Sequence, residues 1–162
     1  MQKKLIIIFI LIMSLFSCKK IEFKDAKCEE ITNVESYNEL VKKAAAVTFE
    51  NYYFIDLRSD IDYRGGYISN FYPSNHIPYE NEETIDKIIN HINETNKASF
   101  NAPIVLLSSG YPNDATSTIV YDLLMARGYK NLKNVVIGYK GLYEGYEIGF
   151  PYSLRDGSDC GC

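Results

Sequence analysis

Apolar residues along this chain follow two alternating patterns, short runs and longer stretches with helical spacing. The runs Tyr52–Leu57 and Ile104–Leu107 are almost entirely apolar and are bounded by polar residues or proline. Such runs are typical of strands that are buried on both faces of a sheet. Weaker signals at Cys28–Ile31 and Val135–Ile137 predict an edge strand and a further short strand.

Three stretches between these strands carry apolar residues at the spacing of an amphipathic helix. The first contains Tyr37, Leu40, Val41 and Ala44, the second Ile85, Ile88, Ile89 and Ile92, and the third Ile119, Val120, Leu123 and Leu124. Thr32 and Glu35 have the spacing of a capping box before the first helix. Gly128 predicts the end of the third helix, and residues 141–146 predict a last helical turn.

Strands that alternate with helices predict an α/β fold with a doubly wound parallel sheet. Residues 65–81 contain glycine, proline, asparagine and serine and predict an irregular loop. The chain shows no internal repeat and no second domain boundary, so we expect a single domain. Its composition, 46% hydrophobic and 23% charged, is that of a globular protein.

The loop after Ile104–Leu107 leads directly into the third helix, with Gly110 and Pro112 as turn residues. The first N–H groups of a helix have no partner inside the helix, so this arrangement is a general way to build an anion site. Asn113 and Asp114 are expected to cap the helix. An acidic side chain there would compete with an anionic ligand for the same N–H groups.

The N-terminus has the features of an export signal. Met1–Lys4 is basic, and Leu5–Phe16 is an apolar stretch that is too short for a comfortable membrane span. It is followed by Ser17 and Cys18, and the whole segment resembles a bacterial lipoprotein signal. We therefore expect residues 1–17 to be a signal peptide, residues 18–27 a tether, and Cys18 a lipidated residue that holds the protein in the bacterial cell envelope. An uncleaved anchor and a plain signal peptide are the alternatives.

Four segments of the body, taken in order, resemble the rhodanese-like domain, a family of small α/β sulfurtransferases and their inactive relatives. They are the strand that ends in Asp56-Leu57-Arg58, the segment Asp62–Ile68 with Tyr67 where histidine is usual, the strand, loop and helix from Pro103 to Tyr129, and the glycine spacing of Gly141–Pro151 with Gly145 where tryptophan is customary. The resemblance covers residues 28–152. It implies a doubly wound parallel sheet with a ligand cleft beside the loop that follows Leu107.

In active members of that family this loop begins with a cysteine whose thiolate accepts sulfane sulfur. Here Ser108 or Ser109 stands at the matching position, and no cysteine lies between Lys97 and Gly128. A serine hydroxyl needs an adjacent base to act as a nucleophile. The candidate base is His76, in the irregular loop 65–81. A serine hydrolase that depends on this pair is the least favoured hypothesis. The resemblance therefore implies a protein without sulfurtransferase activity.

The same resemblance implies that the old cleft binds a protein partner or a small anion. The expected contact residues are Asp56, Arg58, Ser108, Ser109, Gly110 and Asn113. For Asp56 and Arg58 we favour a structural interpretation, in which hydrogen bonds and an ion pair orient the loops. No cofactor and no metal site are expected. A net charge of −4 without a basic stripe argues against a nucleic-acid partner.

Three cysteines remain once Cys18 is lipidated. Cys160 and Cys162 lie in residues 153–162, which we expect to be a flexible tail, and Cys28 is the first residue of the predicted edge strand. Disulfides persist in exported proteins, so a bond from Cys28 to one tail cysteine is the simplest hypothesis. The alternative function is a sulfur carrier or redox protein that uses Cys160 and Cys162.

Overall fold

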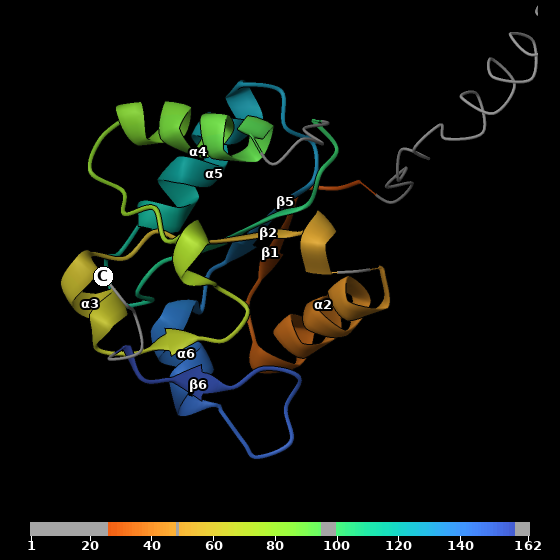
Figure 1. The fold of residues 1–162 in the computed structure, drawn as a ribbon, viewed down its shortest axis with the longest axis vertical. Helices are drawn as coiled ribbons and strands as arrows, with labels where there is room; N and C mark the ends of the chain where they lie inside the picture. Colours follow the sequence, from red (N-terminus) through yellow and green to blue (C-terminus); the bar gives the residue numbers. More distant parts are fainter. Residues whose placement is uncertain (1–25, 48, 95–99, 158–162) are drawn as a thin grey trace, which may run out of the picture.

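Four parallel strands form the centre of the protein (Figure 1). The computed structural model describes residues 26–47, 49–94 and 100–157. The strands are β1 (Glu29–Ile31), β2 (Tyr53–Asp56), β4 (Ile104–Leu107) and β5 (Leu132–Val135), in the order β1-β5-β4-β2. Because all of them run in the same direction, their carboxyl ends meet at one edge of the sheet.

Helices cover both faces of this sheet. α2 (Val34–Val47) and α6 (Gly138–Glu144) pack on one face, and α4 (Glu83–Glu94) and α5 (Thr116–Ala126) pack on the other. The side chains of β4 alternate between the two cores, with Val105 in the first and Leu106 in the second, because successive residues of a strand point to opposite faces. The predicted α/β class, a mostly parallel sheet flanked by helices, is confirmed.

A second, smaller sheet lies below the first in Figure 1. It pairs β3 (Tyr67–Ile68) with β6 (Leu154–Arg155) in antiparallel fashion. The short helices η1 (Phe49–Asn51), α3 (Asp60–Arg64) and η2 (Pro73–Asn75) complete the described elements. Ordered structure therefore occurs inside the predicted loop 65–81 and continues past residue 153, where we had expected a flexible tail to begin.

The strand β5 starts three residues earlier than predicted and ends at Val135. Its middle residues, Lys133 and Asn134, are polar but buried, so the apolar pattern did not reveal them. Lys133 is satisfied at the sheet edge because its Nζ lies 2.9 Å from Glu29 Oε1 and donates to the carbonyl oxygen of Lys27 at 2.8 Å. A lysine with two such partners can occupy a buried strand.

Two further predictions about helices are wrong in detail. Asn33, not Thr32, caps α2, since its Oδ1 accepts the N–H of Ser36 at 2.9 Å. In α5, Val120 and Leu124 are buried as predicted, whereas Ile119 is 43% exposed. The four predicted core positions of α2 are all buried.

Within the described ranges, no helix is both long enough and apolar enough to cross a membrane. The predicted signal peptide, Cys18, Cys160 and Cys162 lie outside the described residues.

Candidate functional site

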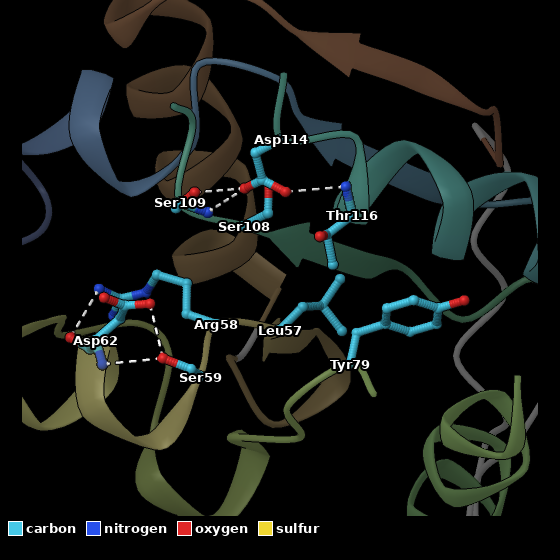
Figure 2. A pocket seen from close by; sticks show the side chains of 9 residues that line it. All are labelled: Leu57, Arg58, Ser59, Asp62, Tyr79, Ser108, Ser109, Asp114 and Thr116. Atoms are coloured by element: carbon cyan, nitrogen blue, oxygen red, sulfur yellow. Dashed lines mark hydrogen bonds between the residues drawn. The ribbon is translucent and has the colours of Figure 1, made fainter. Parts of the chain in front are cut away.

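A polar cleft of about 160 Å³ lies at the carboxyl edge of the sheet, between the loops that follow β2 and β4 (Figure 2). The lining residues are Leu57, Arg58, Ser59, Asp62, Tyr79, Ser108, Ser109, Asp114 and Thr116. Of the predicted contact residues, the structure thus brings Arg58, Ser108 and Ser109 to the cleft. The other three, Asp56, Gly110 and Asn113, do not line it.

Several lining residues were missed from the sequence, namely Leu57, Ser59, Asp62, Tyr79 and Thr116. Ser59 and Asp62 enter the cleft because Ser59 caps α3, a helix of five residues that the sequence pattern did not indicate. The sequence does contain a signal for this cap, because Ser59 directly precedes the acidic first turn of α3. In the structure, Ser59 Oγ accepts the N–H of Asp62.

The ion pair between Asp56 and Arg58 is buried beneath the cleft. The side chain of Asp56 is 0% exposed and that of Arg58 is 2% exposed. Arg58 Nη2 donates to Asp56 Oδ2 at 2.8 Å, and Arg58 Nε donates to both carboxylate oxygens at 3.0 and 3.1 Å. A fork of this kind is a strong charge-assisted interaction.

Other N–H groups of the Arg58 guanidinium, and one side of its plane, also have partners. Nη2 donates to the carbonyl oxygen of Gly66 at 3.0 Å, and Nη1 donates to that of Asp62 at 3.3 Å. Its central carbon lies 3.8 Å from the centroid of the Tyr139 ring, which is cation–π distance. Arg58 is therefore a scaffold residue whose charge is already balanced, in agreement with our structural interpretation, and it offers little to an incoming anion.

The loop after β4 is held by the start of α6. Tyr139 N–H donates to Ser108 O at 2.8 Å, and Lys140 N–H donates to Ser109 O at 2.9 Å. Gly110 has a φ of 73°, and a Cβ at this position would lie 2.2 Å from the carbonyl oxygen of Ile137. Only glycine fits this close approach, so the role of Gly110 is to let the loop pack against α6.

The carboxylate of Asp114 occupies the amide groups that an anion would use (Figure 2). Oδ2 accepts the N–H of Ser109 at 2.8 Å and its hydroxyl at 2.5 Å. Oδ1 accepts the N–H of Thr116, the first residue of α5, at 3.0 Å. The sequence analysis expected an acidic side chain to compete with an anionic ligand for these N–H groups. In the structure, Asp114 accepts them. Asn113 is exposed and supplies a left-handed turn with a φ of 74°, in place of the helix cap that we predicted for it.

The pKa of Asp114 follows from this environment. Partial burial by itself would raise the pKa, but hydrogen bonds from Ser109, Thr116 and Ser108 together outweigh that effect and lower it to about 2. The carboxylate is consequently ionised at neutral pH, and the loop carries a fixed negative charge.

The two serines differ in accessibility. Ser108 is 2% exposed, and its Oγ lies 3.2 Å from that of Ser117. Ser109 is half-buried and bonded to Asp114. Of the two positions proposed for the missing cysteine, Ser109 is thus the more open to the cleft.

His76 does not complete a serine–histidine pair. Its Nε2 lies 2.9 Å from the carbonyl oxygen of Arg58, and its ring stacks on Tyr63 with centroids 4.0 Å apart. A carbonyl oxygen only accepts, so Nε2 carries a proton. Its Nδ1 lies 3.8 Å from an oxygen of Asp60. His76 is not among the residues that line the cleft.

Cys28 lies at the opposite edge of the sheet, just before β1. It is half-buried and contacts Tyr121. Burial first, and then the interaction with Cys28, raises the pKa of Tyr121 to about 12. The predicted disulfide from Cys28 stays a prediction, because both proposed partners lie outside the described residues.

Comparison with known proteins gives similarity of fold only. The sequence matches no protein-family model and no curated protein. The crystal structure of the Rhodanese_3 like domain of the Alr3790 protein from Anabaena sp. is 17% identical, with a TM-score of 0.44 over 63% of this chain and 98% of that one. A crystal structure of the Alr3790 protein is 16% identical, with a TM-score of 0.48 over 72% and 77% of the two chains.

The solution structure of the rhodanese-like domain of the same Anabaena protein is 14% identical to this chain. Its TM-score is 0.49, over 85% of this chain and 86% of that one. At this level of similarity, the α/β class rests on the strand order and helix placement of this chain itself.

Proposed function

We propose that this chain is a membrane-anchored, rhodanese-like protein that has lost sulfur transfer and uses its cleft to bind a protein partner. The observation that carries the proposal is the position of Asp114. Its carboxylate accepts the N–H groups of Ser109 and Thr116. Those are the donors that an anionic substrate or persulfide would need.

Sulfur transfer requires a thiolate in the cleft, and the lining residues contain none. A thiolate at Ser109 would also sit against an ionised carboxylate. Like charges at that separation repel strongly when partly shielded from water. Both the missing nucleophile and the fixed negative charge therefore support a protein that is not a sulfurtransferase.

Serine chemistry is disfavoured for a separate reason. Ser109 is hydrogen-bonded to Asp114, but a general base works best with a pKa near the operating pH. The pKa of Asp114 lies at about 2, so this carboxylate is a very weak base. With His76 bonded elsewhere, none of the described residues that line the cleft could activate either serine.

The negative charge of the cleft favours a partner that brings N–H donors. The carboxylate of Asp62 is exposed and accepts one hydrogen bond, from Ser59 Oγ, the carboxylate of Asp114 is ionised, and the guanidinium of Arg58 is paired with Asp56. Of the two ligands expected from the sequence, a protein partner that inserts a lysine or arginine side chain fits this chemistry better than a small anion.

Exposed apolar side chains near the carboxyl edge support a protein partner. Ile61 on α3 is 84% exposed, and Tyr111 in the loop after β4 is 59% exposed. Tyrosine is enriched at protein interfaces because its ring is large and amphipathic. Ile61 precedes Asp62, and Tyr111 follows Ser109 by two residues, so both are adjacent in sequence to cleft residues.

The first experiment measures transfer of sulfur from thiosulfate to cyanide. We expect no thiocyanate above background for the wild type. A control variant, Cys160→Ser/Cys162→Ser, excludes a contribution of the tail. Activity that persists in this variant would show that the loop itself transfers sulfur.

A second experiment compares two probes by NMR, sulfate and methylguanidinium. Methylguanidinium should shift the amide signals of cleft residues such as Asp62, whereas sulfate should leave Ser109 and Thr116 unchanged. In Asp114→Asn, sulfate should begin to shift one of those two amides, because the asparagine keeps only one acceptor oxygen for them. Sulfate binding by the wild type would contradict the proposal.

Membrane anchoring through Cys18 is tested independently of the cleft. Metabolic labelling with a fatty acid should mark the wild type and leave Cys18→Ala unlabelled. Equal labelling of both would refute the anchor but not the proposal for the cleft.

A thiol-dependent carrier that uses Cys160 and Cys162 is the second candidate function, and one observation favours it. The described chain ends at Gly157, where a Cβ would lie 1.9 Å from the carbonyl oxygen of Arg64. Gly157 thus lies beside α3, which contributes to the cleft, and Cys160 and Cys162 follow it closely in sequence. If they carry sulfur, thiosulfate should leave a persulfide on the wild type that is absent from Cys160→Ser/Cys162→Ser.

A further inference from the structure

The two edges of the central sheet face in different directions. Because the four strands are parallel, the segments that lead into them share one edge, which we call the entry edge (Figure 1). The cleft lies at the other edge. Ala26 begins the described chain at the entry edge. Cys18 precedes it by eight positions, so a fully extended link spans less than about 30 Å. A lipid on Cys18 would keep the fold close to the membrane.

An aromatic side chain is held exposed at the entry edge. Phe100, which leads into β4, is 58% exposed. Its backbone is fixed, since the carbonyl oxygen accepts the N–H of Lys130 at 2.8 Å, and its ring packs edge-on against Tyr129 with centroids 5.2 Å apart. Met125, in the last turn of α5, is 47% exposed. Apolar side chains that are fixed in this way suit the boundary between lipid headgroups and acyl chains.

Charge differs between the two edges in the same sense. Exposed lysines near the entry edge are Lys27, Lys43 and Lys130, although Lys27 pairs with Glu29 and α4 ends there with Glu94. At the carboxyl edge the exposed acidic residues Asp60, Asp62, Glu82 and Glu83 outnumber the exposed basic residue of α3, Arg64. An anionic lipid surface attracts the first set and repels the second.

We propose that the entry edge rests on an anionic lipid surface, with Phe100 at the level of the headgroups, and that the cleft points away from the membrane. This inference rests on the proposed anchor at Cys18. The short link supplies proximity, and the fixed phenyl ring with the surrounding lysines supplies orientation. The cleft edge, with its carboxylates, is then presented to proteins in the surrounding compartment.

The natural chain contains no tryptophan, so a single introduced tryptophan reports its own position. Phe100→Trp and Ile61→Trp place the probe on opposite edges, both at exposed apolar sites. Each full-length lipidated protein is reconstituted into vesicles that contain anionic phospholipid and phosphatidylcholine with brominated acyl chains. The emission of Phe100→Trp should fall about twofold, because bromine quenches a ring at the boundary of headgroups and acyl chains. The emission of Ile61→Trp should not change.

Matched charge reversals test the electrostatic part. Lys130→Glu should reduce the quenching of Phe100→Trp, whereas Arg64→Glu, which makes the same change on α3, should not. Equal quenching at both positions, stronger quenching at Ile61→Trp, or none at Phe100→Trp in protein that floats with the vesicles would overturn the orientation. Protein that fails to float would refute the anchor, and the orientation with it.

Discussion

Two aspartates at the same edge of the sheet accept hydrogen bonds from their own chain, but in different surroundings. Asp56, at the end of β2, is fully buried and grips the guanidinium of Arg58. Asp114, in the loop after β4, is half-buried and accepts hydrogen bonds from the N–H groups of Ser109 and Thr116. The first carboxylate neutralises a buried cation, whereas the second neutralises only partial charges.

This difference indicates which carboxylate supports the fold and which one can be replaced with a smaller loss of stability. Removing one member of a buried ion pair leaves an uncompensated charge away from water, which is strongly destabilising. Removing a carboxylate from half-buried amide groups beside an open cleft leaves donors that water can reach, so the loss is smaller. We therefore expect Asp56 to determine the stability of the fold and Asp114 to determine the chemistry of the cleft.

The largest effect is expected for Asp56→Ala. Loss of this carboxylate leaves the buried Arg58 guanidinium without its counter-ion and should lower the free energy of unfolding by about 3–5 kcal/mol. Urea denaturation followed by circular dichroism measures it. Asp62→Ala is the matched control, because it removes an exposed carboxylate nearby and should cost less than about 1 kcal/mol.

A double variant tests whether the unpaired charge of Arg58 causes this loss of stability. Asp56→Ala/Arg58→Met removes the stranded charge as well, so it should be less destabilised than the sum of the two single variants. Equal stability of Asp56→Ala and Asp62→Ala would mean that the buried pair does not support the fold.

The sequence predicted the sheet and the long helices because apolar residues dominate them. The four buried positions of α2 and the run Ile104–Leu107 were recognised from spacing alone. β5 was misplaced because Lys133 and Asn134 resemble surface residues and are buried only through contacts made with distant parts of the chain. A pattern of residue types carries no information about such partners.

The cleft was predictable only in part. Its location followed from the strand, loop and helix around Ser109, and Asp114 was expected to act near the helix start. The contribution of Ser59 and Asp62 depends on how α3 folds back over the end of β2, which no local pattern specifies. The contacts that hold the Arg58 guanidinium were equally hidden, because Gly66 and Tyr139 approach it from other segments.

Introducing a thiol at Ser109 tests whether Asp114 controls the loop. In Ser109→Cys the thiolate would lie beside the carboxylate, and its pKa should exceed the free value of about 8.5. In Ser109→Cys/Asp114→Asn the carboxylate charge is gone and the loop N–H groups can stabilise the thiolate, so the pKa should fall below that value. A difference of one unit corresponds to about 1.4 kcal/mol. The pH dependence of alkylation by iodoacetamide, with all other cysteines replaced by serine, measures it.

Ser108→Cys provides the control for this thiol. Position 108 is buried, so its thiol should titrate above the free value both with Asp114 and with Asn at position 114. We also expect the double variant at position 109, and not the single one, to take up sulfur from thiosulfate. Identical pKa values for Ser109→Cys with and without Asp114→Asn would show that Asp114 does not govern the anion-binding capacity of the loop.

The smallest effect concerns the stability that Asp114 itself provides. Its pKa is about 2 in the folded protein, below the unfolded value of about 3.9. A carboxyl group with a depressed folded pKa stabilises the fold fully above its unfolded pKa, and this contribution disappears as the pH falls through the folded pKa. Because much of the group faces solvent, screening should reduce its contribution to about 1 kcal/mol at neutral pH.

Asp114→Asn should therefore be about 1 kcal/mol less stable than the wild type at neutral pH. The amide that replaces the carboxylate keeps one acceptor oxygen, but its NH₂ group faces the N–H of Ser109 or of Thr116, where two donors cannot bond. The difference between the two proteins should shrink below pH 4 and become small near pH 2, where about half of the wild-type carboxylate is protonated. Urea denaturation at a series of pH values follows it. A difference that stays constant down to pH 2 would mean that the loop is stabilised by the shape of residue 114 and not by its charge.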